Sequence, residues 1–165
     1  MSFVCSVCGR THDGVPAWTY GRPDHWLGLS LEQRALGALN DDLCRTPDGH
    51  YFVRAVLELP LIGGPEPTFE LGVWGSLNAV NFDRYIDTFD HDDQSKLGRM
   101  SSYLSNEVRG FPGSHSLKGN LRPQDHRKRP FMDLEPGDHP LALAQREGIS
   151  FDKALEITHP DEVRH

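Results

Sequence analysis

Two neighbouring segments of the chain, residues 51–59 and 69–77, constrain its fold more than any other feature. Apolar residues recur at every second position in both, as at Val53, Ala55 and Leu57. Alternate side chains of an extended strand point to opposite faces, so each segment is predicted to be a strand with one buried face. The connection, residues 60–67, contains Gly63-Gly64 and is too short for a crossover helix. The two strands are therefore predicted to form an antiparallel hairpin.

The opposite face of the first strand carries two charged residues. Arg54 and Glu58 are four positions apart, so their side chains point the same way. We expect each to pair with a side chain across the sheet rather than to act together as an acid and a base.

Helices are predicted on both sides of the hairpin. Ser30 and Gln33 have the spacing of a capping box, which predicts a helix ending near Asn40. Asn78 is a favourable N-cap, and it precedes an apolar stripe at helical spacing formed by Phe82, Tyr85, Ile86 and Phe89. Further helices are predicted over residues 140–147 and after Ser150.

Short strands near residues 100–104, 116–121 and 131–134 complete the predicted fold. Strands grouped in the middle of the chain with helices around them indicate an α+β class, with a central, mainly antiparallel sheet and flanking helices. A length of 165 residues fits one domain, residues 1–165. Glycines and prolines interrupt residues 1–28, so that segment is predicted to be irregular.

Charge and hydropathy exclude several classes of protein. The net charge of −7 argues against general nucleic-acid binding and suits a basic protein partner. No apolar run is long enough for a membrane helix, and no secretory leader is recognisable, so we expect a cytoplasmic protein with reduced thiols. The acidic segment 83–93 and the basic segment 126–129 are interpreted as solvated surface.

The first residues contain a cysteine pair that predicts half of a zinc site. Cys5 and Cys8 have C-x-x-C spacing, which suits two thiolates on one zinc ion, and Gly9 allows the chain to fold back tightly. A closed structural site needs four ligands, and Cys44 and His12 complete a Cys₃His set. Such a site would pin the irregular segment 1–28 in a zinc-knuckle-like conformation and contribute folding free energy.

Alternatives to this zinc site stay open at the level of sequence. His25 or His50 could replace His12 as the fourth ligand. The cysteines could also be ordinary reduced thiols without metal, since one C-x-x-C pair is only half of the strong signature. A redox pair usually follows a strand and opens a helix, whereas here only four residues precede Cys5 and Gly9 follows Cys8, so that interpretation is disfavoured.

Eight segments, the cysteine segment among them, resemble a known family. They are Cys5-x-x-Cys8-Gly9-x-x-His12-x-Gly14, Asp42-Leu43-Cys44, residues 52–58, residues 72–77, Asn81-Phe82-x-Arg84-Tyr85, Arg129-Pro130, residues 139–142 and Gln145-x-x-Gly148-Ile149. In these residues the chain resembles a bacterial family of uncharacterised proteins classed as a domain of unknown function. The resemblance implies that the three cysteines and His12 belong to the family pattern, and it implies a cytoplasmic protein of about this length.

The sequence favours a zinc-stabilised binding or interaction module without catalytic activity. The zinc half-site is present, whereas the recognised hydrolase, phosphate-loop and dinucleotide motifs are not. A narrower hypothesis is an inhibitor of a basic partner, attracted by the acidic charge. One alternative is a metal-dependent hydrolase in which Cys5, Cys8 and His12 leave a position for water, and another is a thiol-based metal or redox sensor.

Overall fold

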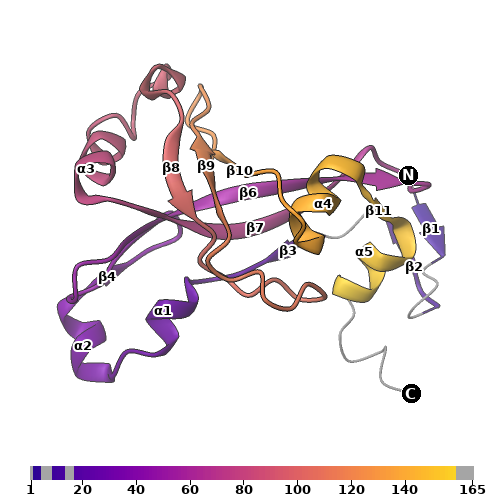
Figure 1. Cartoon of the computed structure of the whole chain (residues 1–165), viewed down its shortest axis with the longest axis horizontal. Coiled ribbons are helices and arrows are strands. Elements are labelled where there is room, and N and C mark those ends of the chain that lie inside the picture. The colour runs from indigo at the N-terminus through magenta and orange to yellow at the C-terminus, as the bar shows by residue number, and fades with distance from the viewer. Residues whose placement is uncertain (1, 5–8, 14–16, 159–165) are drawn as a thin grey trace.

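The predicted hairpin forms the long axis of the molecule (Figure 1). This computed structural model describes residues 2–4, 9–13 and 17–158. Strands β6 (Tyr51–Ile62) and β7 (Thr68–Leu77) pair antiparallel, from Tyr51 opposite Leu77 to Pro60 opposite Thr68. The hairpin prediction is therefore confirmed, with β6 continuing past Pro60 before the chain turns.

A mixed sheet is built around this hairpin. Its main path runs in the order β3-β7-β6-β10-β9-β8; β5 and β11 also pair with β6, and β4 pairs with β5. The additional strands are β3 (Trp18–Thr19), β4 (Ala38–Leu39), β5 (Leu43–Arg45), β8 (Met100–Tyr103), β9 (Lys118–Arg122), β10 (Phe131–Leu134) and β11 (Ile149–Ser150). β3 pairs parallel with β7, and β10 and β11 pair parallel with β6, while the other pairs are antiparallel.

Helices surround the sheet, which is consistent with the α+β prediction. They are α1 (Asp24–Leu27), α2 (Leu31–Leu36), α3 (Ala79–Asp87), the 3-10 helix η1 (Gln94–Leu97), α4 (Pro140–Glu147) and α5 (Phe151–Thr158). The predicted caps are present: Ser30 and Gln33 form the capping box, the Asn81 amide donates to Asn78, and the Lys153 amide donates to Ser150. None of the helices in residues 17–158 is both long and apolar enough to cross a lipid bilayer.

Helix α2 ends earlier than the sequence predicts. It stops at Leu36 instead of near Asn40, because the chain turns at Gly37 into the short strand β4. A Cβ atom at Gly37 would lie 2.7 Å from the carbonyl oxygen of Arg45, so the close approach of two backbones requires glycine there.

The two faces of the hairpin contribute to two apolar clusters. The larger cluster contains Val53, Ala55, Leu57 and Leu59 of β6, together with residues of β7, α3, α4 and α5. The smaller cluster contains Trp26, Cys44, Phe52 and Trp74. Burial of both sets holds α1 and β5 against the hairpin.

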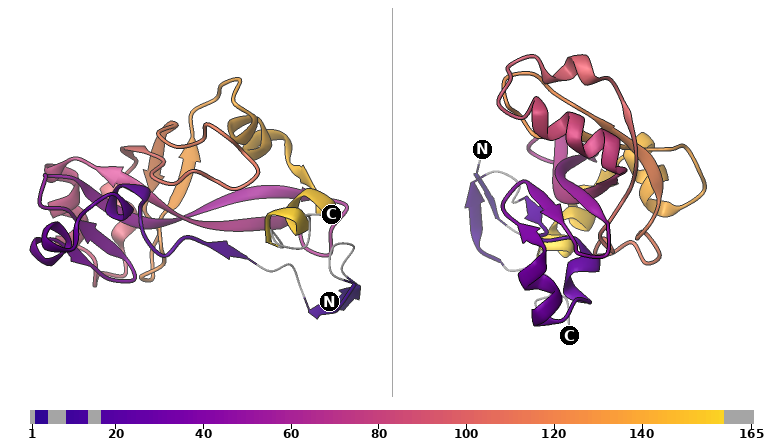
Figure 2. Two further views of the ribbon diagram at one scale, coloured as in Figure 1. Left: turned by 90° about the horizontal axis from the view of Figure 1, so that it is seen from below. Right: turned by 90° about the vertical axis from the view of Figure 1, so that its left-hand side faces the viewer.

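The N-terminal segment, predicted to be irregular, contains short elements in its described residues. β1 (Ser2–Val4) pairs antiparallel with β2 (Thr11–Asp13), and Gly9 has a φ of +74° in the connection between them. Figures 1 and 2 place this small sheet at the end of the molecule where α5 lies, whereas α2 and β4 lie at the other end. The prediction that residues 5–8 form part of a zinc knuckle lies outside the described residues.

Candidate functional site

An open pocket of about 630 Å³ lies beside β6 and β10, and we refer to it as the sheet pocket. Its lining residues are Asp42, Val56, Glu58, Glu70, Tyr85, Phe89, Gln94, Gln124, Arg127, Lys128, Arg129 and Phe131. The volume falls within the range of about 300–1,000 Å³ that is usual for small-ligand sites. Apolar rings and charged groups are mixed in its walls.

Two carboxylates form one charged part of the lining. Glu58 of β6 lies directly opposite Glu70 of β7 in the sheet register. Partial burial and the neighbouring charge of Glu70 raise the pKa of Glu58 above its usual range. Like charges at facing positions of adjacent strands are destabilising, so this pair reduces the stability of the hairpin.

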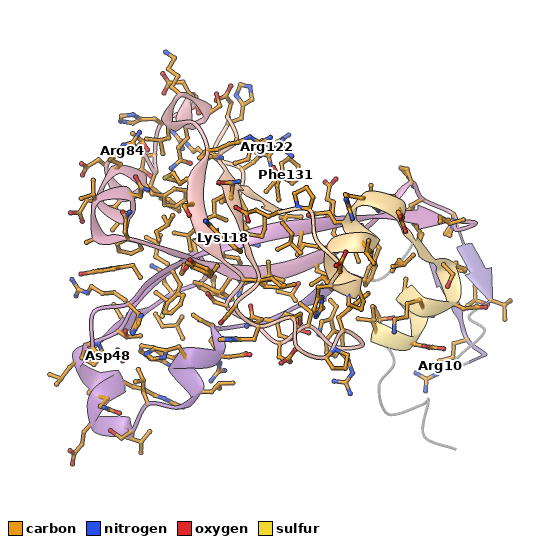
Figure 3. The ribbon with its side chains drawn as sticks, in the orientation of Figure 1. Arg10, Asp48, Arg84, Lys118, Arg122 and Phe131 are labelled. Atoms are coloured by element: carbon orange, nitrogen blue, oxygen red, sulfur yellow. The ribbon has the colours of Figure 1, made fainter. Side chains whose placement is uncertain are left out.

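Neither carboxylate of this pair has a salt-bridge partner among the residues that the structure describes. The guanidinium of Arg122 lies over the Phe131 ring, 4.5 Å from its centroid, and donates through Nε to Asp133 at 2.8 Å (Figure 3). Arg122 thus lowers the pKa of Glu58 only through its charge at a distance. The expectation that Glu58 pairs with a side chain across the sheet is therefore wrong, because the residue opposite it carries a like charge.

The other charged residue on that strand face, Arg54, does pair with a side chain across the sheet, as expected. The guanidinium of Arg54 lies 5.2 Å from the Trp74 ring and donates to the carbonyl oxygen of Tyr20 at 3.1 Å. Trp74 stands opposite Arg54 in the register, so the cross-strand partner of Arg54 is an aromatic ring.

A basic loop, residues 126–129, supplies the second charged part of the lining. Asp42 accepts a hydrogen bond from Arg129 at 2.9 Å, and Asp92 lies 3.6 Å from Arg127. Lys128 has no ion-pair or hydrogen-bond partner through its side chain within the described residues. The acidic and basic segments, interpreted from sequence as separate solvated surface, thus meet through Asp92 and Arg127, which are both exposed.

The backbone of this loop is held in a strained conformation. His126 and Arg127 have φ angles of +62° and +60°, which non-glycine residues rarely adopt. Each such residue costs on the order of 1–3 kcal/mol, and strain of this kind often accompanies function. The His126 amide donates to the Asp92 carbonyl at 2.8 Å, and Gln124 donates to the Arg129 carbonyl at 2.7 Å. These contacts keep the loop against the pocket.

The lining of the sheet pocket combines acidic, basic and aromatic side chains. Three acidic side chains, Asp42, Glu58 and Glu70, face the same space as three basic ones, residues 127–129. The described lining contains no histidine, cysteine or serine, so it offers no pairing of such a nucleophile with a histidine base. Tyr85 adds a phenol whose pKa is raised by burial and by the charge of Asp42, so it remains a neutral hydrogen-bonding group.

The predicted zinc ligands are not brought together by the described residues. Cys5 and Cys8 lie outside those residues, and only the backbone of His12, in β2, is described. Cys44 is a buried free thiol in β5, packed with Trp26, Phe52 and Trp74. β5 pairs with β4, which lies at the end of the molecule opposite β2 (Figure 1). Burial raises the pKa of the Cys44 thiol to about 12. The Cys₃His site stays a prediction.

The two histidines considered as alternative ligands do lie together. His25 and His50 have ring centroids 4.4 Å apart, and both approach the carboxylate of Asp48. Sequence analysis did not identify Asp48. Its spacing from His50 in the turn Asp48-Gly49-His50 is a local signal, but the approach of His25 depends on the tertiary fold.

Comparison with known proteins identifies a family and no function. No curated protein and no solved structure matches the chain. A family model described as "Uncharacterized protein conserved in bacteria (DUF2199)" matches residues 4–149. The matched range contains the whole β6–β7 hairpin and every residue that lines the sheet pocket. The chain therefore belongs to this bacterial family of uncharacterised proteins.

Proposed function

We propose that the protein is a non-catalytic binding module whose sheet pocket takes a zwitterionic ligand. A cationic group of the ligand, an amine or a guanidinium, would contact Glu58 and Glu70. An anionic group, a carboxylate or a phosphate, would contact Lys128 on the basic loop. The observation that carries the proposal is the facing pair Glu58 and Glu70, which lines the pocket and forms no salt bridge with a cation of the described residues.

A bound cation would remove an unfavourable interaction that the unliganded protein retains. Glu58 and Glu70 repel each other, and partial burial of Glu58 increases the cost of its charge. A ligand amine between the two carboxylates would reverse the sign of that interaction and make charge-assisted hydrogen bonds. Tyr85, Phe89 and Phe131 would contact the apolar part of the ligand.

The basic loop supports an anionic group on the same ligand. Ion pairs with Asp42 and Asp92 neutralise Arg129 and Arg127, whereas Lys128 retains three donors for an incoming anion. The strained φ angles at His126 and Arg127 are consistent with a loop whose conformation is maintained for binding. A basic protein partner that inserts one lysine or arginine side chain is a narrower version of the same proposal.

A structural zinc ion at the N-terminus remains part of the proposal. The antiparallel pairing of β1 with β2 and the positive φ of Gly9 support it, because they fold the chain back on either side of residues 5–8. Cys44 lies in β5, away from β2, so its position does not support its role as a ligand of this zinc ion. Zinc content of Cys5→Ser and Cys44→Ser proteins decides the ligand set: loss in both assigns Cys44 to the site, and loss in Cys5→Ser alone does not. We also propose a cytoplasmic location, where the Cys44 thiol stays reduced.

The test uses free amino acids and dipeptides with lysine or arginine side chains as probes in isothermal titration calorimetry. We expect at least one probe to bind the wild-type protein, and we expect Glu58→Gln and Glu70→Gln each to weaken its affinity about tenfold. Lys128→Ala is expected to weaken a probe with a free carboxylate and to leave its amidated form unchanged.

Glu156→Gln is the matched control, because Glu156 is an exposed carboxylate on α5 and does not line the pocket. This variant should bind like the wild type. Equal probe affinity in Glu58→Gln, Glu70→Gln and wild-type protein would refute the proposal, as would the failure of every probe to bind.

A further inference from the structure

A second cluster of functional side chains lies away from the sheet pocket, at the end of the molecule that carries α1 and β5. Among the described residues, His25, Asp48 and His50 form the one group of three whose metal-ligating atoms all lie within 4.8 Å of one another. Asp48 is labelled at this end in Figure 3. None of the three lines the sheet pocket.

A short turn fixes two members of the cluster. The Thr46 amide donates to the His50 carbonyl at 2.9 Å, and the His50 amide donates to the Thr46 hydroxyl at 3.1 Å. Gly49, with a φ of +87°, allows the chain to reverse between them, and its amide donates to the Thr46 carbonyl at 3.2 Å. Asp48 and His50 therefore project from a rigid turn that leads directly into β6.

The third member is positioned from a distant part of the sequence. The Asp24 carboxylate, next to His25, accepts hydrogen bonds from Asn106 at 3.2 Å and from the Glu107 amide at 2.7 Å. The Asp24 amide donates to the Ser105 carbonyl at 2.9 Å. These contacts fasten α1 to the segment after β8 and set His25 beside the turn.

An aromatic ring lies close to both imidazoles. The ring centroid of Phe52 lies 6.1 Å from that of His25 and 6.3 Å from that of His50, and Phe52 is itself buried. The imidazoles are thereby held against an apolar surface on one side, while His50 and Asp48 remain exposed on the other. Neutral imidazoles held in fixed orientations are favourable metal ligands.

We propose that His25, Asp48 and His50 bind a divalent transition-metal ion such as Zn²⁺, at a site separate from the thiols near the N-terminus. The Nε2 atoms of His25 and His50 lie 2.8 Å and 3.8 Å from the same Asp48 oxygen. Ligand atoms of a tetrahedral zinc ion lie about 3.4 Å apart, given bonds of about 2.1 Å. Side-chain rotations alone therefore suffice to admit the ion.

The ligand set also defines what the bound ion offers. Two imidazoles and one carboxylate leave at least one coordination position, and the exposure of Asp48 and His50 allows water or a small anion to occupy it. The ion would tie α1 to the turn before β6, two segments that are joined at present by the 2.8 Å contact between His25 and Asp48.

The test measures Zn²⁺ binding to the full chain by titration and by metal analysis after dialysis. The variants are His25→Ala, His50→Ala and the double variant Cys5→Ser/Cys8→Ser, with His91→Ala as the control. His91 is an exposed histidine outside the cluster. Circular dichroism establishes that each variant is folded before zinc is added.

We expect wild-type and His91→Ala proteins to bind one zinc ion that His25→Ala and His50→Ala proteins lose. If the variants retain this ion, we expect their affinity for it to be at least tenfold weaker. That difference is expected to persist when the cluster variants are made in the Cys5→Ser/Cys8→Ser background. Identical zinc binding in wild-type, His25→Ala and His50→Ala proteins would overturn the proposal. Loss of the histidine-dependent zinc in the Cys5→Ser/Cys8→Ser protein would also overturn it, because the histidines would then complete the thiol site.

Discussion

Replacing Asn106 with alanine tests how the N-terminal segment is attached to the hairpin. The side chain is fully buried, and its Oδ1 accepts a hydrogen bond from the Trp74 amide at 2.8 Å. Its Nδ2 donates to the Arg22 carbonyl at 2.9 Å and to the Asp24 carboxylate at 3.2 Å. One side chain thus connects β7 to the segment that carries α1.

The expected cost follows from what the substitution leaves unpaired. The Trp74 amide is buried and has no route to water, so losing its acceptor costs about 1–3 kcal/mol. Arg22 is exposed and Asp24 partly exposed, so water can replace their lost donor, and each contributes about 0.5 kcal/mol. The total is about 2–4 kcal/mol of unfolding free energy. For a chain of this length that corresponds to a fall of roughly 6–12 °C in Tm.

Equilibrium urea denaturation measures the effect, with an unchanged m-value as the sign that the unfolding transition itself is the same. Asn120→Ala is the control, because Asn120 is a partly buried residue of β9 whose side chain makes no hydrogen bond within the described chain. A loss below about 1 kcal/mol in Asn106→Ala, or a loss equal to that of Asn120→Ala, would refute the reasoning.

Three further substitutions or modifications give defined outcomes. Glu70→Gln should raise the unfolding free energy by about 0.5 kcal/mol at pH 7. The pKa of Glu58 is raised in the folded state, so Glu58 is protonated below pH 4.5 and no longer repels Glu70. The gain in unfolding free energy should therefore vanish below pH 4.5, and denaturation at pH 7 and below pH 4.5 measures this change. Gly119→Ala should cost about 1–3 kcal/mol in the same assay, because its Cβ would overlap a backbone carbonyl of β10, whereas Gly21→Ala meets open space and should cost less than 1 kcal/mol. Alkylation followed by mass spectrometry should leave Cys44 unmodified at pH 8 until urea unfolds the chain, since burial raises its pKa to about 12; rapid labelling of the folded protein would contradict its placement.

Local sequence patterns predicted the helices and strands of this fold well, because the interactions that start and end these elements join residues close together in the sequence. Ser30, Asn78 and Ser150 cap helices through hydrogen bonds to residues three positions away, and such spacing is visible in the sequence. The alternation in β6 and β7 likewise identified the hairpin and its buried face. The end of α2 was missed, since the need for Gly37 arises from the backbone of Arg45 on a different strand.

The candidate sites could not be predicted in the same way, because they depend on register and on parallel pairing. Glu58 faces Glu70 only through the register of the β6–β7 hairpin. The basic loop reaches the pocket because β10 pairs parallel with β6, with Phe131 opposite Val56, and that pairing joins residues far apart in the chain. His25 meets Asp48 only after α1 has docked, so neither site has a contiguous motif.

Chemical-shift mapping by NMR tests the central claim most directly. The ¹⁵N-labelled protein is titrated with the zwitterionic probe that binds best, and the backbone amides that shift are assigned. The account predicts saturable shifts at Glu58, Glu70 and Lys128, and their loss in Glu70→Gln protein. Shifts confined to other surfaces, or unchanged shifts in Glu70→Gln protein, would contradict the assignment of the sheet pocket as the binding site.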